Sequence, residues 1–223
     1  MKKTLDDIYT NITYRISSCL GPIDTTRYNQ HIFGDIIEVD EYGNKKNDIG
    51  RMEANKLLLG EACNNSWDLF SICDTDHHIL EVGEIVYDFE ENDFVQPIRD
   101  FYDDLWENDI LILNRIEIFP EYRGMGIGKH LIKDLYNNFI QGCALFVLKC
   151  FPLQAEAGIL DRHKEHAIKM GYLDFEKDKA KSFKKLHSYY KSIGFLNIPS
   201  ISKEYMFMNP IVKNKKFQSI VLE

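Results

Sequence analysis

Two apolar runs that flank a glycine-rich turn and an amphipathic segment constrain the fold of this chain more than any other feature. Residues 110–118 and 143–150 are nearly continuous apolar runs of strand length, which is typical of buried strands. Between them, residues 127–139 place an apolar side chain at every fourth position, as one face of a helix does. A strand, a helix and a second strand in this order predict a parallel pair joined by a right-handed crossover.

The segment before this unit predicts an extension and a hairpin. Residues 1–30 are interpreted as an N-terminal extension, in which apolar residues at helical spacing favour one short helix. These apolar residues are Leu5, Ile8, Tyr9 and Ile12. Alternating apolar residues on both sides of a turn at residues 41–44 predict a β-hairpin over residues 32–59.

Two charged segments are expected to interrupt the main domain, residues 31–210, as helical insertions. The first lies at about residues 66–109, where acidic and aromatic residues recur at mostly helical spacing, and the second at about residues 153–180. The elements expected after them are a helix over residues 182–193, a strand over residues 205–208 and a tail, residues 211–223, that could add one more strand.

Composition excludes several classes of function. With 223 residues, 44% hydrophobic and 28% charged, the chain suits one globular domain with appendages. The net charge of -8 argues against nucleic acid as a partner, because phosphate neutralisation needs a surplus of basic residues. Five cysteines without a CxxC pair indicate neither a disulfide framework nor a thiolate metal site, which fits a reducing cytoplasm. We also expect no membrane segment, since no apolar run approaches the required length.

The glycine-rich turn that precedes the amphipathic helix is typical of an anion site, because backbone N–H groups and the helix N-terminus converge there. The dinucleotide fingerprint GxGxxG does not fit, since Lys129 occupies the position of its third glycine. The nucleotide loop GxxxxGK[ST] does not fit either. His130 replaces its metal-binding hydroxyl, and Arg123 stands where its first glycine should be.

The pattern R-x-x-G-x-G does fit, at Arg123, Gly126 and Gly128, within the string IEIFPEYRGMGIG. This string resembles the pyrophosphate loop of the GNAT superfamily of acyl-CoA N-acyltransferases. A second string, YKSIGF beginning at Tyr190, is similar to a later helix of that family that ends in Tyr-x-x-x-Gly-Phe. The resemblance covers roughly residues 110–208.

The resemblance implies an α/β fold with a mixed, mostly antiparallel sheet, splayed at a central parallel strand pair and flanked by helices. It implies transfer of an acetyl group from acetyl-CoA to a primary amine, by direct attack in a ternary complex. The partners would be acetyl-CoA and an amine acceptor, either a small molecule or a protein, and a homodimer is compatible with this function. The alternative is a non-catalytic acyl-CoA-binding regulatory module.

Roles for individual residues follow from the same resemblance. The backbone amides of the turn would bind the CoA pyrophosphate with the charge of Arg123 nearby, and the main chain of residues 116–118 would pair with the pantetheine. Tyr190 would be the general acid, with Tyr189 as the fallback. The expected cofactor-binding residues are Ile116, Glu117, Ile118, Arg123, Gly124, Met125, Gly126, Ile127, Gly128 and Lys129.

The general base stays open, with Glu53, Glu61 or a water molecule as candidates. Strand alternation places Glu117 on the face opposite Ile116 and Ile118, which argues against it.

Other reactive side chains have simpler interpretations. Cys150 is expected to be a small buried apolar residue. His163 and His166 lie in a charged stretch typical of a solvated helix face, so no metal is assigned. His77 and His78 have no partner within local reach in the sequence and are expected at the surface or in a pocket wall.

Overall fold

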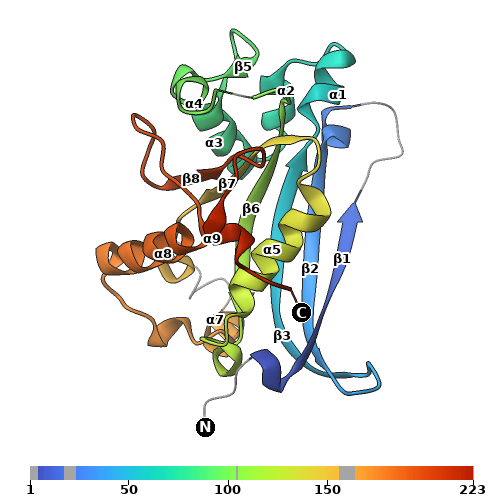
Figure 1. Cartoon of the computed structure of the whole chain (residues 1–223), viewed down its shortest axis with the longest axis vertical. Helices are drawn as coiled ribbons and strands as arrows, with labels where there is room; N and C mark the ends of the chain where they lie inside the picture. Colours follow the sequence, from blue (N-terminus) through green and yellow to red (C-terminus); the bar gives the residue numbers. More distant parts are fainter. Residues whose placement is uncertain (1–4, 18–23, 104, 156–163, 223) are drawn as a thin grey trace.

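The computed structural model describes residues 5–17, 24–103, 105–155 and 164–222 (Figure 1). Its centre is one six-stranded sheet in the order β1-β2-β3-β6-β7-β8. The strands are β1 (Tyr9–Ser17), β2 (Asn29–Val39), β3 (Lys45–Leu57), β6 (Asp109–Ile118), β7 (Cys143–Lys149) and β8 (Tyr205–Met208). Every neighbouring pair is antiparallel except β6 and β7, which are parallel. The predicted mixed, mostly antiparallel sheet with one parallel pair is therefore confirmed.

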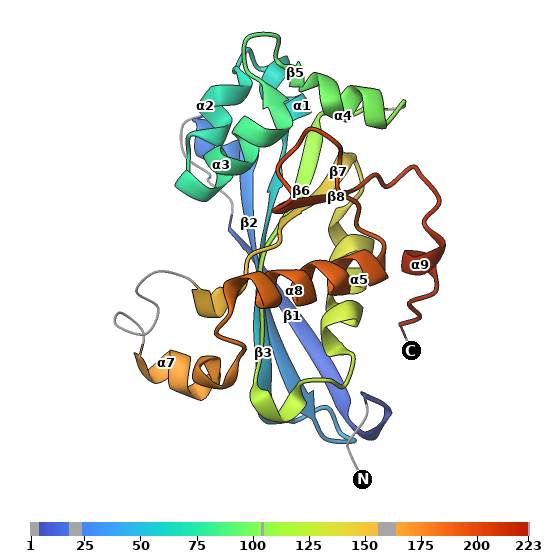
Figure 2. The same cartoon turned by 90° about the vertical axis from the view of Figure 1, so that its left-hand side faces the viewer.

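Both faces of the sheet are covered, because side chains alternate between two hydrophobic cores along the central strands. In β6, Leu111 and Leu113 enter the first core, while Ile110 and Ile112 enter the second. The first core is closed by α5 (Ile127–Phe139), α8 (Lys179–Ile193) and α9 (Lys215–Gln218). Figure 2 shows α5 and α9 on one side of the sheet and α3 and α7 on the other.

The second core lies under α1 (Leu59–Asn64) and under the helices of the first predicted insertion. These helices are α2 (Leu69–Cys73), α3 (His77–Val86) and α4 (Gln96–Phe101). The insertion also contains a two-stranded sheet of β4 (Tyr87–Asp88) and β5 (Asp93–Phe94), which was not predicted. The remaining elements are η1 (Leu5–Asp7), η2 (Thr25–Tyr28), η3 (Pro120–Tyr122), η4 (Leu153–Ala155), α7 (Lys164–Lys169) and η5 (Tyr172–Asp174).

Most sequence predictions of local structure are confirmed, and two are wrong. The hairpin, the long helix α5, both apolar strands and the late helix α8 all form where they were expected. The short N-terminal helix does not form beyond the single 3-10 turn η1. Residues 9–17 instead make the edge strand β1, in which Ile12 and Tyr14 pack on the first core and the Tyr14 hydroxyl donates to Asp134 of α5 at 2.7 Å. Pairing with β2 over the whole strand outweighs the local helical spacing.

The second correction concerns the tail. Residues 215–218 form the single-turn helix α9 in place of an additional strand. The side chain of Asn214 accepts a hydrogen bond from the backbone amide of Phe217 at 3.2 Å and so caps this turn. The buried ring of Phe217 packs against Tyr136 of α5.

Candidate functional site

Strands β6 and β7 run side by side for only part of their length. Their parallel pairing stops at Leu113, opposite Leu148, while β6 continues to Ile118. Residues 114–118 therefore have β3 on one edge and, in the described part of the chain, no strand on the other. Backbone groups on such an edge are available to an extended ligand that adds as a further strand.

A β-bulge in β6 marks the point where the two strands separate. Glu53 of β3 lies opposite Arg115, whereas the next residue, Ala54, lies opposite Leu113, so Asn114 is left without a partner on β3. A bulge bends the strand locally and re-aims its side chains. Both Asn114 and Arg115 consequently line two adjoining cavities.

The larger cavity, about 650 Å³ in volume, lies along the unpaired edge of β6. Its walls include residues 113–118, Gly124 and Gly128 of the glycine turn, and Tyr189 and Tyr190 of α8. Although the chain carries a net charge of -8, basic side chains outnumber acidic ones in this wall. The basic side chains are Arg115, Arg123, Lys149 and Lys185, and the acidic ones are Glu117 and Glu176. The size is within the range of small-molecule sites, about 300 to 1,000 Å³.

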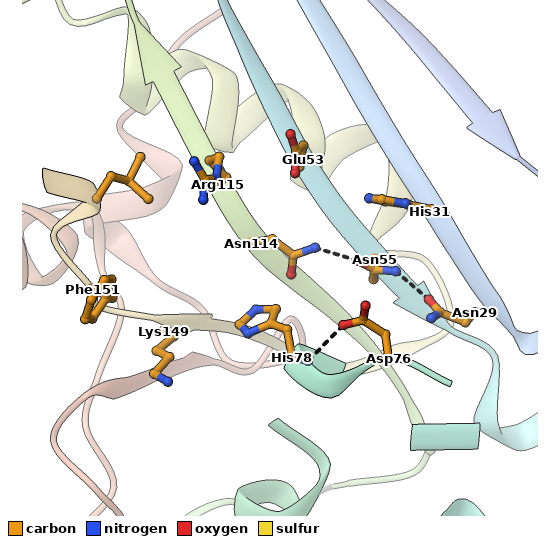
Figure 3. A pocket seen from close by; sticks show the side chains of 11 residues that line it. Asn29, His31, Glu53, Asn55, Asp76, His78, Asn114, Arg115, Lys149 and Phe151 are labelled. Carbon is orange, nitrogen blue, oxygen red and sulfur yellow. Dashed lines mark hydrogen bonds between the residues drawn. The ribbon is translucent and has the colours of Figure 1, made fainter. Parts of the chain in front are cut away.

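The smaller cavity, about 480 Å³ in volume, lies on the other side of Asn114 (Figure 3). Acidic, basic and amide side chains of β2, β3, β6, β7 and α3 surround it. Its wall residues are Asn29, His31, Glu53, Asn55, Asp76, His78, Asn114, Arg115, Lys149, Phe151 and Leu153. The residues that it shares with the larger cavity are Asn114, Arg115, Lys149, Phe151 and Leu153. The two cavities therefore adjoin along these residues.

The glycine turn has a backbone that only glycine adopts easily. Gly124 and Gly126 have φ angles of 77° and 88°, in the left-handed region. A Cβ atom on Gly128 would lie 2.8 Å from the Tyr189 hydroxyl. The Lys129 amide donates to the Gly126 carbonyl at 3.1 Å, whereas the five amides before it donate to no carbonyl of the described residues. These amides, at the N-terminus of α5, form a site that favours an anion.

Two residues of the turn can offer a ligand only their backbone. The side chains of Met125 and Ile127 are buried in the first core. The Lys129 amide, which was predicted to bind the cofactor, is already used within the first turn of α5.

Arg123 holds the turn in place through its guanidinium. Its Nε atom donates to the carbonyl of Ile118 at 2.8 Å, and its Nη2 atom donates to the carbonyl of Met170. The guanidinium carbon lies 4.4 Å from the ring centroid of Phe175, and burial lowers the pKa of Arg123. The side chain therefore links the turn to the segment after α7, while it also lines the larger cavity.

Known proteins and simple site patterns do not identify the site. No protein-family model, curated protein or solved structure matches this chain. None of the described helices combines the length and apolar character that a membrane span needs. Among the residues that the structure describes, no three His, Cys, Asp or Glu side chains are grouped as ligands of one metal ion would be.

Tyr189 and Tyr190 both reach the larger cavity from the end of α8. The Tyr190 ring packs against Phe195, with 6.0 Å between ring centroids, and against Tyr189, at 5.3 Å. Burial raises the pKa of Tyr190 above its ordinary value of 10 and that of Tyr189 to about 12. Both hydroxyls are therefore protonated at neutral pH and have a proton to give.

The two carboxylates considered as general bases lie in different places. Glu53 lines the smaller cavity. Glu61 lines neither of the two cavities, and its carboxylate lies 3.6 Å from the guanidinium of Arg27. Of the two, only Glu53 is placed to meet a substrate.

The histidines differ from their sequence interpretation. His77 and His78 do have a local partner, because Glu81, one turn further along α3, lies 3.9 and 3.8 Å from their rings. His77 is exposed, whereas His78 lines the smaller cavity, as a pocket wall residue would. His166 lies 3.0 Å from the buried Glu117 and so is not simply part of a solvated face. His163 lies outside the described residues.

Cys150 is buried, as expected, and burial raises its pKa to about 12. At neutral pH it is a thiol, which is a poor nucleophile.

Three asparagines in the wall of the smaller cavity were not predicted (Figure 3). Asn114 donates to Asn55, and Asn55 donates to Asn29. One sequence signal could have indicated these asparagines. Asn114 is a polar amide that directly follows the apolar residues 110–113 of a strand.

Glu117 is the most buried charged group of the site. As alternation predicts, it points away from Ile116 and Ile118, which pack on the first core. Its carboxylate accepts hydrogen bonds from Arg51, His166 and Tyr172. Burial acts to raise the pKa of Glu117, but the hydrogen bonds from Arg51, Tyr172 and His166 outweigh it and lower the pKa to about 2. The network fixes β6 to α7 and η5.

Glu117→Gln is expected to lower the free energy of unfolding at pH 7 by about 3 kcal/mol. The folded pKa is about 2 and the ordinary value is 4.5, so this stability is fully present above about pH 4.5. It is lost as the pH falls from there towards 2, and the wild type and the variant should converge. Urea unfolding at pH 7 and at pH 3 measures both effects. Glu121→Gln, at an exposed carboxylate, should change the stability by less than about 0.5 kcal/mol. Equal unfolding midpoints for Glu117→Gln and the wild type at pH 7 would contradict the prediction.

Proposed function

We propose that this protein is an acyl-CoA-dependent N-acyltransferase of the GNAT type, which transfers an acetyl group from acetyl-CoA to a primary amine in a ternary complex. One observation carries the proposal. Within the described part of the chain, a single cavity joins a glycine turn whose five amides donate to no carbonyl, the unpaired edge of β6 and the two tyrosines of α8. These are the parts that a diphosphate, a pantetheine chain and a leaving thiolate respectively require.

The residues present fit CoA in shape and in charge. The amides of the turn favour the diphosphate, and the four basic side chains of the wall add positive potential around it. The edge of residues 114–118 offers backbone donors and acceptors to the two amide groups of the pantetheine. Acyl-CoA would supply an activated thioester carbonyl at the end of the unpaired edge that lies away from the glycine turn, where β6 and β7 separate.

The protein groups around that point account for the remaining chemistry. A backbone N–H on the unpaired edge of β6 beside the bulge would polarise the thioester carbonyl, a contribution typically worth about 2.7 to 4 kcal/mol. As the C–N bond forms and the C–S bond breaks, Tyr190 would give its proton to the leaving thiolate. The smaller cavity, across the shared wall, is where the amine would approach.

Calorimetry with CoA and with pantetheine tests the binding half of the proposal. CoA should bind at least about 100-fold more tightly, because pantetheine lacks the diphosphate and its charge-assisted hydrogen bonds. No measurable affinity for CoA, or equal affinities for the two, would overturn the assignment. Thiol release from acetyl-CoA against polyamines, amino sugars, amino acids and peptides then identifies the acceptor.

A further inference from the structure

The smaller cavity contains two buried polar atoms without a hydrogen-bond partner among the described residues. They are Nε2 of His78 and Oδ1 of Asn114. One comes from the N-terminal turn of α3 and the other from the bulge of β6, and Figure 3 shows the two side chains close together in the cavity wall. Buried polar atoms are nearly always paired in folded proteins, so two that face one cavity mark a place where a ligand or a water molecule pairs with them.

The orientation of Asn114 follows from a chain of hydrogen bonds with a fixed end. Thr75 donates to the carbonyl of Ile72 at 2.9 Å, and a carbonyl can only accept. The Thr75 hydroxyl oxygen therefore accepts from the amide of Asn29, at 3.1 Å. Asn29 then accepts from Asn55, which accepts from Asn114. Each amide is oriented by the next, so the NH₂ group of Asn114 is used and its oxygen is left to the cavity.

The second atom is also an acceptor. Nδ1 of His78 lies 3.8 Å from Oε2 of Glu81. Lys149 donates a hydrogen bond to the same oxygen at 2.8 Å and holds the carboxylate in place. The negative charge of Glu81 on this side favours the tautomer with its proton on Nδ1, which leaves a lone pair on Nε2, beside the Asn114 side chain. Burial lowers the pKa of His78, so the ring is neutral at pH 7.

Two acceptors require a ligand that donates twice from one atom. A primary amine, an ammonium group or a water molecule does so, whereas a hydroxyl has a single hydrogen and would leave one acceptor unpaired. Arg115 and Lys149 in the same wall are paired with Glu117 and Glu81. Glu53 and Asp76 therefore favour a positively charged nitrogen over water. Asn114 also lines the larger cavity, so a nitrogen held here lies next to the place where the thioester is expected.

We propose, on the basis of the acyltransferase function above, that the acceptor nitrogen binds between His78 Nε2 and Asn114 Oδ1, and that His78 is the general base. The ammonium form first gives one proton to solvent. His78 Nε2 then takes a second N–H proton as the lone pair of the neutral amine bonds to the acyl carbon. The electron pair of the broken C–S bond leaves with sulfur, which receives the Tyr190 proton. Solvent then takes the proton from His78 and returns one to Tyr190.

The first test compares His78→Gln with His77→Gln in the full-length protein. His78→Gln keeps a polar group of similar length but has no basic nitrogen, and should lower kcat about 100-fold with CoA affinity within about twofold of wild type. His77→Gln changes an exposed neighbour and should retain full activity. A kcat for His78→Gln equal to that of the wild type would overturn the role of His78.

The pH dependence provides a readout that a structural role would not move. In the wild type, kcat should fall as the pH drops through the pKa of His78, below the ordinary 6.5, because the protonated ring cannot accept a proton. This acid limb should be absent in His78→Gln. The charged and titratable groups that face His78 are Glu81 and His77 on its own helix, Asp76 at the helix cap and Lys149 from β7. An acid limb of the same shape in both proteins would count against the proposal.

A second variant tests the amine site independently. Asn114→Ala should raise the KM for the amine about tenfold or more while CoA binding stays within about twofold. An unchanged KM would overturn this half of the inference. The outcomes separate the two proposals. Wild-type protein that neither binds CoA nor releases thiol removes the acyltransferase function and this inference together, whereas active His78→Gln and Asn114→Ala variants remove the inference alone.

Discussion

Tyr190→Phe is expected to lower the rate of CoA release about 100-fold or more, while CoA affinity stays within about twofold of wild type. The change removes only the hydroxyl, so the ring can keep its packing against Phe195 and Tyr189. Without that proton, the thiolate has to leave as the free anion. Stopped-flow detection of released thiol, together with calorimetry for CoA, measures the two quantities separately.

Tyr189→Phe is the matched control, because it removes a hydroxyl from the neighbouring ring in the same cavity wall. It should change the rate by less than about tenfold. If the two variants behave in the opposite way, Tyr189 is the acid, and if neither changes the rate, tyrosine acid catalysis is wrong. Wild-type protein that binds CoA but releases no thiol with any amine would support the alternative, a non-catalytic acyl-CoA-binding module.

Gly126→Asp is expected to weaken CoA binding about 100- to 1,000-fold. A carboxylate at this position would stand within about 4 Å of the diphosphate, where two like charges repel by about 4 kcal/mol at an effective dielectric constant near 20. Aspartate tolerates the left-handed backbone of Gly126 better than most residues and is a good helix N-cap, so the fold should survive. Calorimetry with CoA measures the loss, and circular dichroism checks the fold.

Gly126→Asn separates charge from shape. Asparagine has the same size and imposes similar strain at a φ of 88°, but it carries no charge. It should weaken CoA binding less than about tenfold. If Gly126→Asn and Gly126→Asp weaken binding equally, the turn does not act through its electrostatic attraction for an anion.

The centre of the fold could be predicted because its local signals and its tertiary structure agree. Residues 110–113 and 143–148 are buried on both faces, and α5 turns its periodic apolar face to the same sheet. The N-terminal strand could not be predicted in this way. Its apolar residues fit a helix and a strand about equally well, and only the partner strand β2, which lies beyond residue 28, decides between them.

The two cavities also differ in how far the sequence predicts them. The turn of the larger cavity is one continuous string of sequence, so its backbone chemistry could be predicted. The smaller cavity collects His78, Asn29, Asn55 and Asn114 from four separate elements. Their proximity depends on strand register and on the bulge at Asn114, which no local pattern specifies.

The wall residues common to both cavities, Asn114 among them, suggest a route to a selective inhibitor. A conjugate that tethers the amine to the sulfur of CoA by a short linker would fill both chambers as one molecule. It would lose its translational and rotational freedom once, where two separate substrates lose it twice. The linker also fixes a high effective concentration of each half for its own chamber. Such a conjugate should therefore bind more tightly than CoA. The gain in affinity should be largest when the length of the linker matches the distance between the two binding positions on either side of the shared wall.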